Sequence, residues 1–399
     1  MNPRGLLALA ALMVTGCASL SDVVGARTMA FSSCHPPPGV VLIIGSHRDA
    51  PAPSLDLRLE CQVTAAIRAG RPVLIVVAAG QPKLTIPKLV SVHGGALAQE
   101  DSRVLQNLHR VQAAVREARP DSAGADDLAA LAVAADAARS AGIPHAELAL
   151  IDSGLDDRGA LDFTVPGMVA AAPPEVAHQL EASGNLPDLY GFTVLLVGLG
   201  YTAPPQVPLP AKWRGNVTQI WTAVVTSAGA RTVIIPQPAQ SASVTTSEAV
   251  KPIPVPMDKP VQPNARVSIV FTQESPVGFK PNRTSFAAPA AAAKALTPIA
   301  RWLAADPSRH ALLEGTTADV GPMAGQVRLS RSRADRVRSE LVALGASPAQ
   351  MSTKGVGSDF AQFTPDRDTA GTLLAAPAAL NRSVRITLSH SVPERAQDQ

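Results

Sequence analysis

The stretch Leu329-Ser330-Arg331-Ser332-Arg333-Ala334-Asp335-Arg336-Val337 decides the fold of the C-terminal part of the chain. It opens a run of helical apolar spacing over 329–344 that Gly345 ends. Working outward, we expect a strand over 310–315 before it and another helix over 287–303. Shorter strands are predicted over 267–271, 352–355 and 384–388. This alternation of strands and helices predicts a small α+β sandwich.

Four further fragments surround this stretch. They are Phe279-Lys280-Pro281-Asn282, Gly315-Thr316-Thr317-Ala318-Asp319-Val320-Gly321, Gly355-Val356-Gly357 and Asn381-Arg382-Ser383-Val384. Together, in this order and at these distances, they make residues 266–390 resemble the OmpA-like family of peptidoglycan-binding domains. The resemblance implies a non-covalent contact with the diaminopimelate side chain of the peptidoglycan stem peptide.

The resemblance also implies which residues would hold that ligand. Diaminopimelate carries a free carboxylate and a free ammonium, and the planar fork of an arginine can donate two parallel hydrogen bonds to a carboxylate. The family's arginine corresponds to Arg333, and its loop asparagine to Asn282, for which a plain turn role stays open. The family's aspartate, which takes the ammonium, corresponds to Ala318. Asp319 either swings in to replace it or is a solvated turn residue, and both interpretations stay open.

With alanine at position 318, the loop motif resembles that of OmpA-like domains from high-GC actinobacteria. This similarity implies a lipid anchor in the plasma membrane, facing the wall from its outer side. In a Gram-negative cell the anchor would instead lie in the outer membrane.

The first part of the chain has a different pattern of apolar residues. Five continuous apolar runs, each rich in β-branched residues, suit strands that are buried on both faces of a parallel sheet. They cover 40–44, 73–77, 147–151, 193–197 and 232–235. Helical spacing lies between them over 55–69, 104–118, 125–141 and 217–228. Residues 39–237 are therefore predicted to form an α/β domain with a mainly parallel sheet.

A segment rich in proline, serine and threonine, 238–265, follows this domain. Such a composition predicts an extended linker between units that move independently. Residues 391–399 form a short tail.

The N-terminus has the pattern of an exported lipoprotein. Arg4 precedes a short apolar run that ends in Val14-Thr15-Gly16-Cys17, and this run is too short to span a membrane. The ending resembles a bacterial lipobox, which implies cleavage of signal residues 1–16 and acylation of Cys17. An ordinary signal peptide that happens to contain a cysteine is the alternative. Residues 17–38 then form a tether, and the protein is extracytoplasmic and lipid-anchored.

Two cysteines remain, Cys34 and Cys61. An oxidising compartment favours a disulfide between them over two separate thiols. No histidine cluster accompanies them, so no metal site is predicted.

Polar side chains follow two strands of the α/β domain, where ligands bind in open α/β sheets. Ser46, His47, Arg48 and Asp49 come after the first strand, and Asp152 comes after the third. They predict either a cleft with chemistry or simple helix caps, and the capping role is favoured. Gly198-Leu199-Gly200 lacks the third glycine of a dinucleotide fingerprint. We therefore expect no enzyme and no cofactor.

The composition supports a folded protein, with 46% hydrophobic and 17% charged residues, and a net charge of +3 indicates no nucleic-acid partner. The favoured hypothesis is an envelope lipoprotein that contacts peptidoglycan while its α/β domain faces a ligand or an unknown envelope protein. Two alternatives stay open. One is an exported hydrolase or ligand sensor carried by the α/β domain, and the other is an assembly protein whose OmpA-like domain binds protein rather than wall.

Overall fold

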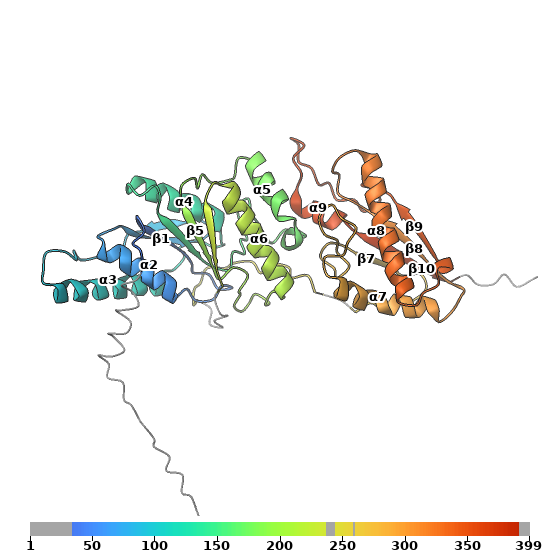
Figure 1. Cartoon of the computed structure of the whole chain (residues 1–399), viewed down its shortest axis with the longest axis horizontal. Coiled ribbons are helices and arrows are strands. Elements are labelled where there is room, and N and C mark those ends of the chain that lie inside the picture. The colour runs from blue at the N-terminus through green and yellow to red at the C-terminus, as the bar shows by residue number, and fades with distance from the viewer. Residues whose placement is uncertain (1–33, 237–243, 258–259, 391–399) are drawn as a thin grey trace, which may run out of the picture.

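The computed structural model describes residues 34–236, 244–257 and 260–390. Two domains lie side by side along the long axis of the molecule, each built around its own sheet (Figure 1). Cys17, and with it the predicted signal and most of the tether, lies outside the described residues, as does the tail.

The N-terminal sheet has six strands in the order β3-β2-β1-β4-β5-β6. Five of them pair in parallel and the short β3 joins β2 antiparallel, so the sheet is mixed. The five are β1 (Val40–Gly45), β2 (Val73–Ala78), β4 (Glu147–Ile151), β5 (Thr193–Val197) and β6 (Arg231–Ile235). Each coincides with a predicted apolar run, whereas β3 (Lys83–Thr85) is exposed and lacks that signal.

Helices cover both faces of this sheet, because alternate side chains of a strand point to opposite faces. Val41 and Ile43 of β1 belong to one core, with α4 (Asp127–Ser140), α5 (Pro173–Ala182), α6 (Ala211–Ser227) and the short η1 (Met168–Ala170). Leu42 and Ile44 belong to the other core, with α2 (Leu57–Arg68) and α3 (Leu97–Glu117).

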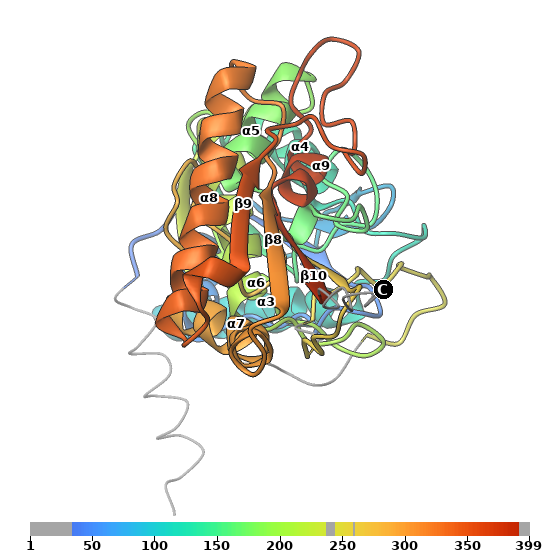
Figure 2. The same ribbon diagram turned by 90° about the vertical axis from the view of Figure 1, so that its right-hand side faces the viewer.

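The C-terminal sheet has four strands in the order β7-β10-β8-β9, with α7 and α8 packed against it (Figure 2). Its elements are β7 (Ser268–Phe271), α7 (Pro289–Ala304), β8 (Arg309–Gly315), α8 (Met323–Ala343), η2 (Pro348–Gln350), β9 (Met351–Gly355), α9 (Ala375–Asn381) and β10 (Val384–His390). The predicted strands and the two long helices are present, and α9 is an addition. Along α8, Ser330, Arg333, Ala334, Val337 and Leu341 are buried, which is the spacing of one helix face.

Packing explains several residues of the sequence motifs. A Cβ atom on Gly315 would overlap the backbone carbonyl of Ser330, so the end of β8 approaches α8 as closely as only glycine allows. Ser330 Oγ accepts a hydrogen bond from the backbone N–H of Gly357 at 3.1 Å. Asn381 is buried, and its side chain both accepts from and donates to the backbone of Thr364. Gly315 and Ser330 thus fix how β8 and the loop around Gly357 pack against the middle of α8, where Arg333 lies.

The two domains are joined by more than the linker. Residues 244–257 pack on the α/β domain, where Val250 and Ile253 are buried and the backbone N–H of Ile253 donates to Gln206. Helix α9 places Ala375 and Ala376 in the core that contains η1, α5 and α6. The predicted linker therefore packs in part on the α/β domain, because apolar residues spaced between the prolines are buried.

Cys34 and Cys61 form a disulfide with their Cα atoms 5.9 Å apart, within the range that the bond requires. It ties the first described residue to α2. Among the described residues, none of the helices has the length and apolar character needed to cross a membrane.

Candidate functional site

Arg333 lies on the buried face of α8, with 3% of the residue exposed. Its guanidinium lies over the ring of Phe279, 5.2 Å from the centroid, and its Nε donates to the backbone carbonyl of Arg283 at 3.2 Å. Burial, and then the charge of Arg382, lower the pKa of Arg333 to about 10. No carboxylate within the described part of the chain forms an ion pair with it. The arginine is thus held rigidly as a desolvated cation that lacks a counter-ion.

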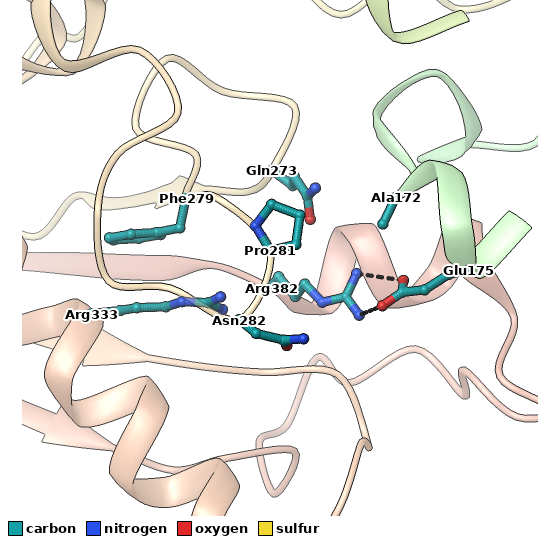
Figure 3. Close-up of a pocket in the computed structure, with 8 residues that line it drawn as sticks. All are labelled: Ala172, Glu175, Gln273, Phe279, Pro281, Asn282, Arg333 and Arg382. Carbon is teal, nitrogen blue, oxygen red and sulfur yellow. Dashed lines mark hydrogen bonds and ion pairs between the residues drawn. The ribbon is translucent and has the colours of Figure 1, made fainter. Parts of the chain in front are cut away.

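Two hollows flank this guanidinium. The first, which we call the arginine hollow, has a volume of about 110 Å³ and is lined by residues that include Arg333, Arg382, Asn282, Ala318, Gln326 and Leu329. The second, the seam hollow, also borders Arg333, Arg382 and Asn282, but its other wall carries Ala172 and Glu175 of the α/β domain. Figure 3 shows the seam hollow, with the Arg333 side chain directed toward Asn282.

Asn282 is held in the left-handed region, with φ of 51°, a conformation that asparagine tolerates better than most residues. Its position between the two arginines agrees with either of the roles expected for it. The structure therefore brings Arg333 and Asn282 together, as the family resemblance implies.

Arg382 belongs to the motif Asn381-Arg382-Ser383-Val384, which leads into β10. Its two terminal nitrogens donate to the two carboxylate oxygens of Glu175, at 2.6 and 2.9 Å (Figure 3). Glu175 lies in the first turn of α5, so the pair crosses the seam between the domains. Sequence reasoning missed it because the partners are 207 positions apart.

Asp319 is occupied elsewhere. One of its carboxylate oxygens accepts from Gln326 Nε2 at 2.9 Å, and the other lies 3.3 Å from Arg367 Nε. It does not line either hollow. In this structure Asp319 lies at a bend with its side chain 44% exposed, so it is closer to the solvated turn residue than to a replacement for the family's aspartate.

The polar residues after β1 and β4 also converge, but inside the α/β domain. Both ring nitrogens of His47 form hydrogen bonds with carboxylates. Nδ1 lies 2.6 Å from Asp49 Oδ1, and Nε2 lies 2.7 Å from Asp152 Oδ2. His47 is 1% exposed, and Ser46 and both aspartates are buried with it. Arg48, by contrast, is exposed. The predicted group is therefore brought together, and its members other than Arg48 are buried.

Electrostatics explain how this cluster is stabilised. Burial alone would lower the pKa of His47, but the carboxylates of Asp152 and Asp49 raise it well above the usual value. Burial and the nearby Asp152 and Asp156 raise the pKa of Asp127, while contact with His47 and Asp127 outweighs burial and lowers the pKa of Asp152. The cation favoured at His47 thus lies between two carboxylates, while Ser46 Oγ and Asp49 Oδ2 are buried without a hydrogen-bond partner among the described residues.

The helix caps of this region are made by residues other than the predicted ones: the N-cap of α2 is Asp56 and that of α4 is Asp126. Asp126 caps α4 by accepting from the backbone N–H of Ala129, and Asp156 accepts from those of Asp127 and Leu128. Within the described ranges, no group of three or more histidine, cysteine, aspartate or glutamate side chains has an arrangement that could hold a metal ion.

Comparison with protein families matches residues 278–371 to the OmpA family. The prediction of an OmpA-like domain at the C-terminus is thereby confirmed for this segment, which contains Arg333 and the other residues that line the arginine hollow except Arg382. A search of curated proteins finds no match to the chain.

Solved structures similar to the C-terminal part include the peptidoglycan-associated lipoprotein from Burkholderia pseudomallei. It is 26% identical and aligns over 28% of this chain and 86% of its own, with a TM-score of 0.24. The periplasmic domain of Helicobacter pylori MotB is 18% identical over 33% of this chain and 82% of its own, with a TM-score of 0.27. The OmpA-like domain of FopA1 from Francisella tularensis is 16% identical over 31% and 72%, with a TM-score of 0.23.

Proposed function

We propose that this chain is a cell-envelope protein whose OmpA family domain binds peptidoglycan non-covalently through the diaminopimelate of the stem peptide. Arg333 would receive the free carboxylate of that residue, and Asn282 would hold the ligand backbone beside it. The OmpA family match over 278–371 and the motifs around Arg333 support this assignment.

The observation that carries the proposal is the state of Arg333. Taking a cation out of water is unfavourable unless an anion or hydrogen-bond acceptors compensate it. Here Phe279 and one backbone carbonyl support the guanidinium, and its pKa is depressed, yet none of the described carboxylates is paired with it. A ligand carboxylate in the arginine hollow would supply the missing charge in a geometry suited to two parallel hydrogen bonds.

We further propose that the protein is exported and held at the membrane by acylated Cys17. The Val-Thr-Gly-Cys sequence supports this, and a disulfide between Cys34 and Cys61 suits an oxidising compartment. Multiple acyl chains would give stable anchoring where one chain is marginal. The actinobacteria-like variant at Ala318 favours the plasma membrane as the site of the anchor.

The α/β domain is proposed to serve as a non-enzymatic module that contacts an envelope partner or ligand. What supports this is the burial of the His47 cluster and the contact of its imidazole with two carboxylates. A general acid or base must reach the reacting group of a substrate, and these side chains are enclosed.

The test is sedimentation of the mature chain with purified diaminopimelate-type peptidoglycan. Arg333→Ala should weaken binding by roughly thirtyfold or more, since removing one partner of a desolvated charge pair costs about 2–5 kcal/mol. The matched control is Arg331→Ala, because Arg331 lies on the same helix and is exposed. Equal binding by the wild type and Arg333→Ala would contradict the proposal, and so would an equal loss in both variants.

A further inference from the structure

The residues around Arg333 leave one requirement of the proposed ligand unmet within the OmpA family domain. Diaminopimelate presents an ammonium as well as a carboxylate, and an ammonium needs an acceptor, best a carboxylate. Ala318 lines the arginine hollow with a methyl group. Asp319, the neighbouring acid, is engaged by Gln326 and Arg367.

A carboxylate does reach this place, from the other domain. Among the described residues, Glu175 is the one acidic residue that lines either of the two hollows. It shares the seam hollow with Arg333, Arg382 and Asn282, the same three residues that border the arginine hollow (Figure 3). A ligand whose carboxylate lies at Arg333 would therefore have the carboxylate of Glu175 in the neighbouring hollow, across from the same arginine.

The position of Glu175 is well supported. Helix α5 begins with proline at its first position, and Glu175 follows in the first turn. One turn later, Gln179 accepts a hydrogen bond from the backbone N–H of Ala375 in α9, at 2.8 Å. Arg382 then fixes the carboxylate by a bidentate contact. Each carboxylate oxygen keeps acceptor capacity, since an ionised carboxylate has about four lone-pair sites and Arg382 uses two.

The size of the seam hollow fits a small cation. Its open volume of about 10 Å³ is roughly the room that one water-sized group needs. An ammonium group has this size, whereas the larger arginine hollow beside it has room for the rest of a side chain.

We propose that Glu175 of the α/β domain supplies the carboxylate that receives the ligand's ammonium, so that both domains together form the wall-binding site. This inference rests on the proposed function. It assigns the α/β domain a role in specificity: Glu175 selects ligands that carry a free ammonium beside a carboxylate. The acid has moved from the loop after β8 to a helix on the other side of the arginine pair.

The experiment uses the mature full chain and two preparations of diaminopimelate-type peptidoglycan, one untreated and one with its free amino groups acetylated. The wild type should bind the acetylated wall about ten- to a hundredfold more weakly, because a hydrogen bond to a charged group contributes roughly 1.5–3 kcal/mol. Glu175→Gln should bind the untreated wall more weakly by a similar factor and should no longer distinguish the two preparations. The amide keeps one acceptor for Arg382, and near-ultraviolet circular dichroism would confirm that the seam is intact.

Glu181→Gln is the matched control, because Glu181 is exposed on the same helix and should bind like the wild type. The inference is overturned if Glu175→Gln still prefers the untreated wall, or if it binds as well as the wild type. Tighter binding by Glu175→Gln would also overturn it, since Glu175 would then compete with the ligand for Arg382. Failure of the proposed function looks different: the wild type would not bind the wall, or Arg333→Ala would bind it unchanged.

Discussion

Two polar clusters of this molecule differ in how their charges are compensated. In the His47 cluster, a buried imidazolium is bracketed by Asp49 and Asp152 at hydrogen-bond distance, and helix-capping backbone groups satisfy further carboxylates. In the arginine hollow, Arg333 is almost as buried, yet its charge is matched by no carboxylate among the described residues. The first cluster resembles a structural network, and the second a site that awaits an anion.

The comparison shows that burial and convergence alone do not mark a functional site. The polar residues after β1 and β4 converge closely, and Ser46, His47, Asp49 and Asp152 are buried. The arginines border two hollows and have a single carboxylate between them. An uncompensated charge beside open volume is the more informative feature.

The largest effect that separates the clusters is expected for His47→Ala. This change leaves Asp49 and Asp152 buried without their cation, which should destabilise the α/β domain by about 3–5 kcal/mol. Urea unfolding in a Trp302→Phe background would measure it through Trp213 and the buried Trp221 of α6. His109→Ala, a change at an exposed position, should stay within about 0.5 kcal/mol. A loss at His47 no larger than at His109 would contradict a structural role.

A smaller effect is expected when the unfolding free energy of the α/β domain is measured as a function of pH. The folded pKa of His47 is raised, so its contribution to stability is fully present below the unfolded value near 6.5 and is lost as pH rises through the folded pKa. In that window the unfolding free energy of the α/β domain should fall by about 1.4 kcal/mol per pH unit. The pKa values of Asp127 and Asp156 are also raised in the folded protein. They too make the unfolding free energy fall as pH rises above the pKa of an aspartate in the unfolded chain.

His47→Gln serves as the control for this dependence, measured by urea midpoints at a series of pH values above 6.5. The variant should lose the part of the slope that belongs to the histidine. An unchanged slope would show that His47 does not carry the charge assigned to it.

The smallest effect on stability is expected for Arg333→Met. The change removes a desolvated cation that lacks a carboxylate partner, together with a ring contact and one hydrogen bond, so these losses and gains should nearly cancel. Thermal unfolding should show a difference of no more than about 1 kcal/mol, while wall binding is lost. A decrease of several kcal/mol in the unfolding free energy would instead show that Arg333, like His47, has a structural role.

Much of this fold follows from local pattern. The apolar runs of β1, β2, β4, β5 and β6 were predictable because strands buried on both faces must be continuously apolar. The two long C-terminal helices and the four strands of their sheet were predictable from periodicity. The exposed β3 was not, because it has no apolar face.

Helices α5 and α9 were missed, and they are the two that form the seam. Pro173 and Pro174 followed by Glu175 are a recognisable helix start, which would have indicated α5. Helix α9 has seven residues, mostly alanine, with a proline inside, and carries little signal. It is held by burial of Ala375 and Ala376 against the other domain.

The residues of the site likewise divide into those that local sequence motifs indicate and those that depend on contacts between distant segments. Arg333 and Asn282 were identified because motifs within one domain carry them. The pairing of Arg382 with Glu175 depends on how two domains meet, and no pattern local to either segment encodes it. The engagement of Asp319 by Arg367 likewise joins two loops that are distant in sequence.

The most direct test of the central claim is calorimetric titration of the full chain with a soluble muropeptide that contains diaminopimelate, beside the same muropeptide amidated at the free diaminopimelate carboxylate. We predict saturable binding of the first and a loss of roughly thirtyfold or more for the second, because amidation removes the anion that Arg333 requires. Equal affinity for both, or binding of neither, would contradict a site built around an arginine that awaits a carboxylate.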